Sequence, residues 1–175
     1  MRITFIGASH GVPEPNRKCS CTMLEIKGRY YFIDMGTPAI DHLVTAGIPI
    51  DAVKGIFITH MHGDHTNGLI HFVDLLSWYF KTSDPIIFLP NTECTKIIGN
   101  WLKVNYTSPR DLHYEEIQPG VIYNDGFLKV TAIQTLHTER SYAFFLEAEG
   151  KSILFTGDLR HPDQDFPVIA KEHET

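Results

Sequence analysis

An apolar segment that runs directly into a histidine-rich loop is the feature of this sequence that most constrains its fold. We expect residues 53–59 to form a buried strand. Three histidines and one aspartate follow within six positions, namely His60, His62, Asp64 and His65. The side chains of His60 and His62 lie on the same side of the backbone wherever it stays extended. Gly63 has no Cβ and lets the chain turn before the next pair, so the sequence predicts polar side chains that converge at the end of a core strand.

These four side chains offer imidazole nitrogens and a carboxylate oxygen. Such groups are the ligands that Zn²⁺ and similar divalent cations take in proteins. The alternative is a solvated, histidine-rich turn that binds no metal. Histidines seldom occur in this order directly after a buried strand by chance, so we predict a metal site.

The H-x-H-x-D-H order of residues 60–65 resembles the metal-binding motif of the metallo-β-lactamase superfamily. In that family the motif follows a core strand and opens a helix, and here residues 67–80 have apolar side chains at helical spacing. Two later motifs of the family also have counterparts, His137 in Thr-Leu-His-Thr-Glu-Arg-Ser-Tyr and Asp158 in Phe-Thr-Gly-Asp-Leu-Arg. A G-x-P-x-x-x-R loop over residues 11–17, together with H-x-x-x-S-Y from His137, is similar to the ribonuclease Z and phosphodiesterase branch.

The resemblance implies an α+β fold, the four-layer αββα sandwich of the superfamily, in one domain over residues 1–175. It also implies a set of metal ligands, with His60, His62 and His137 on a first ion, Asp64 and His65 on a second, and Asp158 bridging the two. A metal-bound hydroxide is then the nucleophile. Asp64 has a second implied role, in which it holds this nucleophile and takes its proton.

One part of the family pattern has no counterpart in this sequence. The family supplies a last histidine to the second metal from a strand well beyond the bridging aspartate, and only 17 residues follow Asp158. Residues 164–175 are expected to form a partial helix, and His173 on it is too near in sequence to serve. We therefore expect the second half of the sandwich to be incomplete. Such a sandwich leaves a sheet edge exposed, which favours association into a homo-oligomer.

The remaining elements follow from alternating apolar residues, helical spacing and turn residues. We expect strands over 2–6, 22–27, 29–34, 86–89, 113–118, 121–123, 127–134, 141–148 and 151–156, and helices over 38–46 and 91–104. Asp34 ends one strand in an I-D-x-G motif, where the resemblance implies that it orients a metal-binding histidine from behind. His10 in the first loop either faces the metal site or is an ordinary polar loop residue.

Composition limits the class of protein. The 175 residues are enough for one domain with a sizeable core, and no apolar run is long enough to cross a membrane. The three cysteines predict ordinary thiols in a reducing, cytoplasmic setting. The net charge of −6 disfavours a general electrostatic grip on nucleic acid. Nucleic acid stays an alternative partner only through a local basic patch of Arg17, Lys18 and Arg29.

The sequence thus predicts a metal-dependent hydrolase whose best-fitting substrate is a small-molecule or nucleotide phosphodiester. Hydrolysis of a carboxylic ester or lactone is one alternative, and a truncated metal-binding fragment with little or no activity is the other. Zn²⁺ is the expected cofactor, with two ions implied by the resemblance. Mn²⁺ and Fe²⁺ are alternatives, because imidazole and carboxylate ligands suit all three metals.

Overall fold

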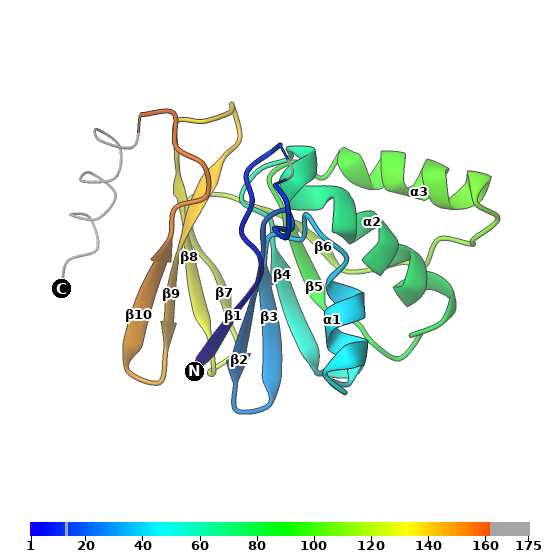
Figure 1. Ribbon diagram of the computed structural model, residues 1–175, viewed down its shortest axis with the longest axis horizontal. Helices are drawn as coiled ribbons and strands as arrows, with labels where there is room; N and C mark the ends of the chain where they lie inside the picture. The colour runs from blue at the N-terminus through cyan, green and yellow to red at the C-terminus, as the bar shows by residue number, and fades with distance from the viewer. Residues whose placement is uncertain (13, 162–175) are drawn as a thin grey trace.

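The computed structural model describes residues 1–12 and 14–161, which form three layers (Figure 1). Three helices cover one face of a six-stranded sheet, and a four-stranded sheet covers the other face. The expected α+β sandwich is therefore present, with three of its four expected layers among the described residues. The helix expected over 164–175, with His173, lies outside the described residues.

The six-stranded sheet has its strands in chain order: β1 (Arg2–Gly7), β2 (Cys21–Ile26), β3 (Arg29–Ile33), β4 (Val53–Phe57), β5 (Ile86–Leu89) and β6 (Tyr114–Glu116). The four-stranded sheet has the order β10 (Lys151–Phe155), β9 (Tyr142–Ala148), β8 (Lys129–Gln134) and β7 (Gly120–Asn124). The helices are α1 (Ala39–Thr45), α2 (Gly63–Trp78) and α3 (Cys94–Val104), with a short 3₁₀ helix, η1 (Ile50–Ala52), before β4.

The topology brings several strand ends to one edge of the first sheet. Strands β1, β2 and β3 pair antiparallel, whereas β3, β4, β5 and β6 pair parallel. Parallel neighbours need crossover connections, and α1, α2 and α3 supply them on one face of the sheet (Figure 1). The carboxyl ends of β3 and β4 consequently meet, so Asp34 lies next to the loop that follows β4.

Two apolar cores lie on the two faces of the six-stranded sheet. Phe32 of β3 faces the helices and belongs to the same core as Phe72 of α2. Its neighbour Tyr31 faces the other way and belongs to the core between the sheets, with Phe144 of β9. Successive side chains on a strand point to opposite faces, so a sheet covered on both sides needs apolar residues at consecutive positions. This requirement explains the continuous apolar run of β3.

Two local features differ from the expectation. The helix expected from residue 67 begins four residues earlier, at Gly63, and η1 is an additional turn. The segment Gly-Asp-His-Thr has low intrinsic helix propensity, but tertiary hydrogen bonds hold its backbone. The Met35 N–H donates to the His65 carbonyl, and the Gly68 N–H donates to the Met35 carbonyl, both at 2.8 Å. The first turn of α2 is therefore fixed by the chain segment that follows β3.

The edges and helices of the described part bear on two further expectations. Strand β10 lies at one edge of the four-stranded sheet in the described part of the chain; the expectation of an incomplete second half stays a prediction. Among the described residues, none of the helices combines the length and the apolar character that crossing a membrane requires.

Candidate metal centre

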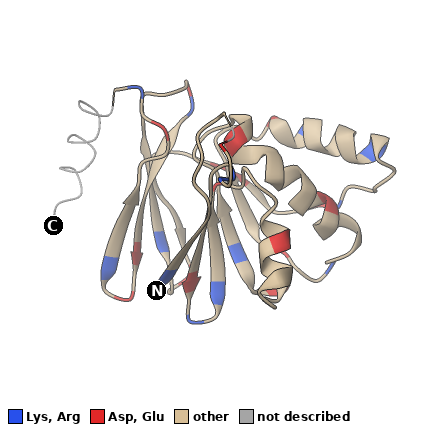
Figure 2. Cartoon of the chain, in the orientation of Figure 1, with Lys and Arg blue, Asp and Glu red and all other residues tan. Residues whose placement is uncertain are grey.

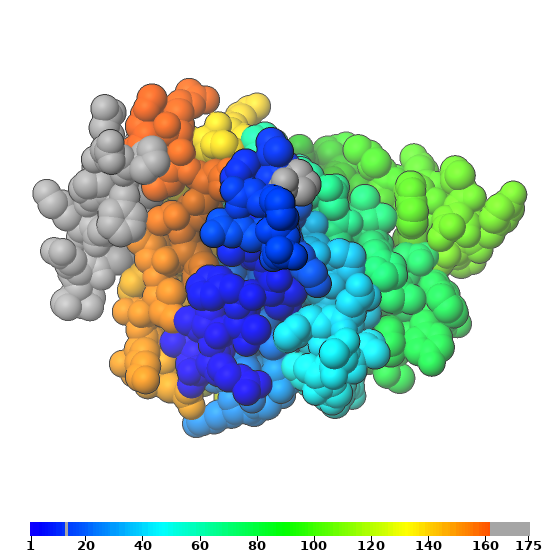
Figure 3. Space-filling view, viewed as in Figure 1, coloured from blue at the N-terminus to red at the C-terminus, as the bar shows by residue number. Residues whose placement is uncertain are grey.

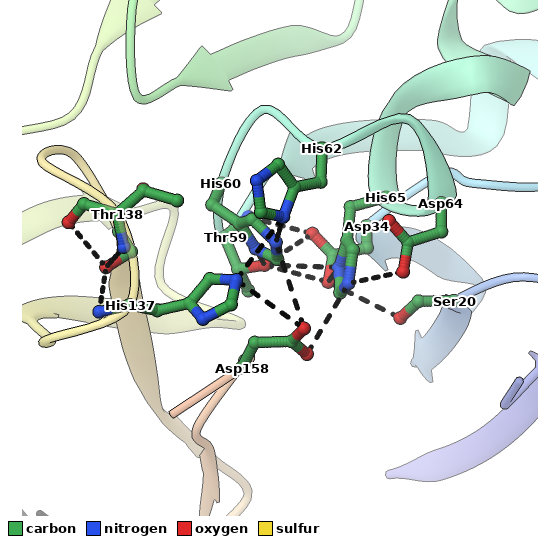
Figure 4. A network of polar contacts seen from close by, with 12 residues as sticks. Ser20, Asp34, Thr59, His60, His62, Asp64, His65, His137, Thr138 and Asp158 are labelled. Atoms are coloured by element: carbon green, nitrogen blue, oxygen red, sulfur yellow. Dashed lines mark hydrogen bonds and ion pairs between the residues drawn. The ribbon is translucent and has the colours of Figure 1, made fainter. Parts of the chain in front are cut away.

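The loop between β4 and α2 directs two histidines at one point (Figure 4). Beyond β4, the Ile58 N–H donates to the Phe88 carbonyl at 3.1 Å, and His60 is fully buried directly afterwards. His62 caps the start of α2 with an extended backbone (φ −64°, ψ 149°). Its Nδ1 lies 3.1 Å from Nε2 of His60. The two histidines therefore project together, as their spacing predicts.

A third histidine reaches the same point from the second sheet. His137, in the loop between β8 and β9, places Nε2 3.3 Å from Nδ1 of His62. The donor atoms of His60, His62 and His137 all lie within 4.8 Å of one another. Ring nitrogens with free lone pairs repel one another at such distances, and a cation between them satisfies all three. The donor set and its spacing thus fit a divalent metal ion.

A carboxylate lies between this first group and a second one. Asp158, which follows β10, has Oδ2 3.7 Å from Nε2 of His137 and 4.0 Å from Nε2 of His60. Its other oxygen, Oδ1, lies 3.5 Å from Nε2 of His65. His60, His65 and Asp158 form a second group of donors within 4.8 Å of one another. Asp158 thus lies within 4.0 Å of histidine nitrogens from both groups.

Asp64 lies at the margin of this arrangement. Its Oδ2 is 3.4 Å from Nε2 of His65, but the residue is outside both groups of mutually close donors. Its side chain is only 13% exposed. Gly11 of the first loop lies over it, because a Cβ on that glycine would be 3.5 Å from Oδ2 of Asp64. Asp64 is thus a shielded carboxylate beside His65.

Asp34 supports the site from behind, buried and in a left-handed conformation (φ 58°). Its Oδ2 accepts a 2.7 Å hydrogen bond from Nδ1 of His65, and its Oδ1 accepts the Thr59 N–H at 2.8 Å. The Thr59 hydroxyl is 3.0 Å from each carboxylate oxygen, and the Ser20 hydroxyl is 3.5 Å from Oδ2. With its proton on Nδ1, His65 presents the lone pair of Nε2 to the cluster. Sequence reasoning expected Asp34 here and missed Thr59 and Ser20, although Thr59 directly precedes the first histidine.

The ionisable groups of the cluster influence one another strongly. Burial, followed by the nearby His65, lowers the pKa of His60 to about 3. For His65, burial lowers the pKa, but hydrogen bonds to Asp158 and Asp34 outweigh burial and raise it to about 10. The hydrogen bond from His65 in turn lowers the pKa of Asp158 to about 2. Asp158 is therefore ionised, and a metal ion that binds Nε2 of His65 would compete with a proton for that nitrogen.

The loop that carries His137 is held by a single hydroxyl. Ser141 Oγ accepts the backbone N–H groups of His137 and Thr138, each at 3.3 Å, and donates to the Thr135 carbonyl at 2.9 Å. Next to it, the Tyr142 N–H donates to the Thr59 carbonyl at 2.9 Å, which joins the two sheets beside the cluster. These bonds fix the histidine of the second sheet against the histidines of the first.

Three other candidate residues lie apart from the cluster. His10 is exposed, with Nε2 3.7 Å from a Glu14 oxygen, and is outside both donor groups. Arg17 also pairs with Glu14, at 2.9 Å. Arg29 begins β3, at the end opposite to Asp34, and pairs with Asp125 at 3.4 Å. The local basic patch expected from the sequence is therefore divided between two regions, and two of its arginines are paired with carboxylates.

Comparison with known proteins places the chain in a family. A sequence model of the family described as Anti-Pycsar protein Apyc1 matches residues 1–175. The chain belongs to the Anti-Pycsar protein Apyc1 family. It is also 30% identical over 155 residues to a ribonuclease Z of Listeria innocua serovar 6a, an alignment that covers 86% of this chain and 50% of that protein. The chain thus spans about half the length of the curated relatives it matches.

Solved structures support the fold of this Apyc1 family member. Human tRNase Z, short form, superposes with a TM-score of 0.73 at 23% identity, covering 89% of this chain and 68% of the human one. The metallo-β-lactamase fold protein YhfI from Bacillus subtilis superposes with a TM-score of 0.68 at 19% identity, covering 89% and 61%. The metallo-β-lactamase fold expected from the sequence is confirmed.

Proposed function

We propose that the histidine cluster binds divalent metal ions and that this centre hydrolyses a phosphodiester. The observation that carries the proposal is the convergence of three imidazole nitrogens, with 3.1 and 3.3 Å between neighbours, beside the ionised Asp158. In the proposed assignment His60, His62 and His137 bind one ion, Asp64 and His65 bind a second, and Asp158 bridges them. Because the chain spans about half the length of its curated relatives, this assignment concerns only the ligands within residues 1–175.

Zinc is the proposed metal. Imidazole and carboxylate donors suit Zn²⁺, and they also suit Mn²⁺ and Fe²⁺, which stay as alternatives. The hydrogen bond from Nδ1 of His65 to Asp34 makes the other ring nitrogen, Nε2, more basic. A more basic nitrogen binds a metal ion more tightly.

The protein groups around the cluster fit hydrolysis at phosphorus. Divalent ions in such a centre lower the pKa of bound water and accept charge from a phosphoryl oxygen. Asp64 is shielded beside His65, where its carboxylate can orient a water molecule and take a proton from it. Helix α2 begins at Gly63, beside His62 and His65 of the cluster, and the positive N-terminal end of a helix favours an anionic substrate. Asp64 thus supplies a base, while the start of the helix attracts the phosphate.

A small nucleotide or similar small phosphodiester is the substrate we propose, with nucleic acid as the alternative that the ribonuclease Z relatives favour. The net charge of −6 gives little general attraction for a polyanion. Arg140, three residues after His137 in the chain, pairs with Glu116 at 2.8 Å, and Arg17 of the first loop pairs with Glu14, so these cations are partly neutralised. A small anion needs only the metal centre and the helix start, whereas a long polyanion needs a basic track.

The experiment that tests the proposal compares substrates and variants at the same metal loading. Zinc-reconstituted protein is assayed with bis(p-nitrophenyl) phosphate, a cyclic nucleotide, a p-nitrophenyl carboxylic ester and a short RNA. We expect turnover of the first two, complete loss after chelation, and a loss of more than about 100-fold in His62→Ala. His113→Ala is the matched control, because His113 is half-exposed and pairs with Glu115 away from the cluster.

The outcomes separate the alternatives. Turnover of the carboxylic ester alone would assign the centre to ester hydrolysis, and turnover of RNA alone would assign it to a nuclease. Metal binding without turnover of any substrate would refute the enzymatic proposal for these 175 residues and leave a metal-binding fragment.

A further inference from the structure

One arginine next to the metal cluster has no acidic partner among the described residues. The sequence has six arginines, and the structure describes all of them. Five form an ion pair with a carboxylate, namely Arg2, Arg17, Arg29, Arg110 and Arg140. In the described part of the chain, Arg160 is exposed and its guanidinium contacts only a backbone carbonyl. A guanidinium keeps its charge at every physiological pH, so this cation is available to an anionic ligand.

Arg160 is held against the loop that carries His137. Its backbone N–H donates to the Leu136 carbonyl at 3.1 Å, and Nη2 of its side chain donates to the His137 carbonyl at 3.5 Å. The orange segment that follows β10 accordingly lies at the surface beside the yellow segment that precedes β9 (Figure 1, Figure 3). The guanidinium therefore contacts the residue whose imidazole belongs to the first donor group.

The segment after β10 presents an anion and a cation two residues apart. Asp158 uses its oxygens on the cluster, at 3.5 Å from Nε2 of His65 and 3.7 Å from Nε2 of His137. Arg160 has five N–H donors on its guanidinium, and with described residues it forms one long hydrogen bond, to His137. The other donors form a planar fork that matches two oxygens of a phosphoryl group. The cation is thus next to the cluster and has donors to spare.

Arg140, which lies in the same loop as His137, is not equivalent. Its Nη1 is 2.8 Å from a Glu116 oxygen and 3.4 Å from the Pro90 carbonyl, so this arginine ties two loops together. The charge of Arg140 is compensated by the carboxylate. Elsewhere the lysines and arginines are spread over both sheets and the helices, without a basic track in the described part of the chain (Figure 2). Arg160 is therefore the arginine suited to a small anion at the cluster.

We propose that Arg160 binds the phosphoryl group of the substrate through its free N–H donors. The inference rests on the proposed phosphodiester hydrolysis. In that reaction the oxygen of a water molecule bonds to phosphorus, the bond from phosphorus to the leaving oxygen breaks, and one proton of the water ends on the leaving oxygen. Negative charge grows on the non-bridging oxygens while the new bond forms. A guanidinium on those oxygens stabilises the transition state more than the ground state.

The same contact selects between substrate classes. A phosphodiester offers two non-bridging oxygens that share a negative charge, whereas a carboxylic ester offers one carbonyl oxygen and no charge. The two parallel N–H groups of a guanidinium match the first arrangement and not the second. Arg160 is thus expected to favour phosphodiesters over carboxylic esters at the same metal centre.

Binding of inorganic phosphate tests the proposal independently of turnover. Isothermal titration calorimetry is run on zinc-reconstituted protein after removal of free zinc, with the wild type, Arg160→Gln, Arg160→Lys and Arg140→Gln. Arg160→Gln should weaken phosphate binding about 10- to 100-fold, as expected for loss of a hydrogen bond to a charged group. Arg160→Lys should retain part of the affinity, because it keeps the charge and loses the fork. The matched control Arg140→Gln should stay within about 3-fold of the wild type, because its charge is already paired at the surface.

Zinc content and kinetics distinguish phosphate binding from support of the His137 loop. All four proteins should hold the same amount of zinc, whereas a loosened loop would release it. With bis(p-nitrophenyl) phosphate, Arg160→Gln should lower kcat/KM at least about 10-fold. Turnover of a p-nitrophenyl carboxylic ester, which has no phosphoryl oxygen, should not fall in the same variant.

The outcomes separate this inference from the proposed function. A chain that binds phosphate through Arg160 and hydrolyses no phosphodiester would refute the proposed activity and support Arg160 as a phosphate ligand. Equal phosphate affinity in the wild type and Arg160→Gln, or no phosphate binding by either, would overturn the inference. An equal loss of affinity in Arg140→Gln would overturn it as well, and so would loss of zinc from Arg160→Gln, because Arg160 would then act only through the His137 loop.

Discussion

Replacing Asp34 with asparagine tests how the site prepares His65 for a metal ion. The carboxylate accepts from Nδ1 of His65 at 2.7 Å and from the Thr59 N–H at 2.8 Å, using both of its oxygens. An asparagine that keeps its one oxygen on the Thr59 N–H must turn its NH₂ group toward His65. Two donors then face each other, and His65 relieves the conflict by moving its proton to Nε2. That proton blocks the nitrogen that faces Asp158 and Asp64.

The expected effect is large and specific. Loss of a partner behind a ligand histidine typically weakens metal binding 10- to 100-fold, equivalent to about 1.4 to 2.7 kcal/mol. Competition against a chromogenic chelator measures the zinc dissociation constant of Asp34→Asn. Asp125→Asn is the matched control, because Asp125 is also held by several hydrogen bonds, but in the turn between β7 and β8. It should lower the melting temperature and leave zinc affinity within about 3-fold of wild type.

Two results would refute the proposed role of Asp34. If Asp34→Asn binds zinc as tightly as the wild type, the tautomer of His65 does not depend on Asp34. If both asparagine variants lose zinc affinity to the same extent, the effect reflects general destabilisation and the proposed role of Asp34 is wrong.

Three further predictions concern the scaffold. Ser141→Ala removes the acceptor for two backbone N–H groups of the His137 loop and should cost about 1 to 3 kcal/mol in unfolding free energy, measured in urea, together with weaker zinc binding. Gly36→Ala should destabilise the protein by about 1 to 3 kcal/mol or more, because its Cβ would lie 1.7 Å from the Asp64 carbonyl oxygen. Gly99→Ala, in open space on α3, should instead stabilise it by about 0.5 to 1 kcal/mol. Equal melting temperatures of the two variants would contradict both predictions. Burial raises the pKa of Asp125, but hydrogen bonds from Tyr31 and the turn backbone outweigh it and lower the pKa below its usual value. The stability that Asp125 contributes is therefore present above its unfolded pKa of about 3.9 and is lost as pH falls through the lower folded value. The difference in unfolding free energy between wild type and Asp125→Asn should therefore narrow on acidification. A difference that widened would contradict this prediction.

Much of this structure could be predicted because its constraints are local. The apolar run before His60 predicts a core strand, and the two-residue spacing of His60 and His62 predicts that they project together. Both expectations agree with the structure. Alternating residues and turn residues also placed the strands of the second sheet to within a few positions.

The features that were missed depend on contacts between distant parts of the chain. The start of α2 at Gly63 is fixed by hydrogen bonds with Met35, and local propensity argues against it. The Ser20 and Thr59 hydroxyls reach Asp34 only after three separate segments meet. No periodic pattern in the sequence indicates that these three residues come into contact.

Helix α3 illustrates a related limit. Trp101 was expected on a helix, and apolar residues at helical spacing ordinarily indicate a face that packs on the core. Helix α3 has two such faces, and only the structure distinguishes the buried side from the exposed one.

Metal stoichiometry tests the central claim most directly. Protein stripped with a chelator and dialysed against zinc is analysed by inductively coupled plasma mass spectrometry, beside His62→Ala and the control His113→Ala. We expect two zinc ions per chain in the wild type and in His113→Ala, and loss of at least one in His62→Ala. A wild-type chain that retains no zinc, or a His62→Ala chain that retains both ions, would contradict it.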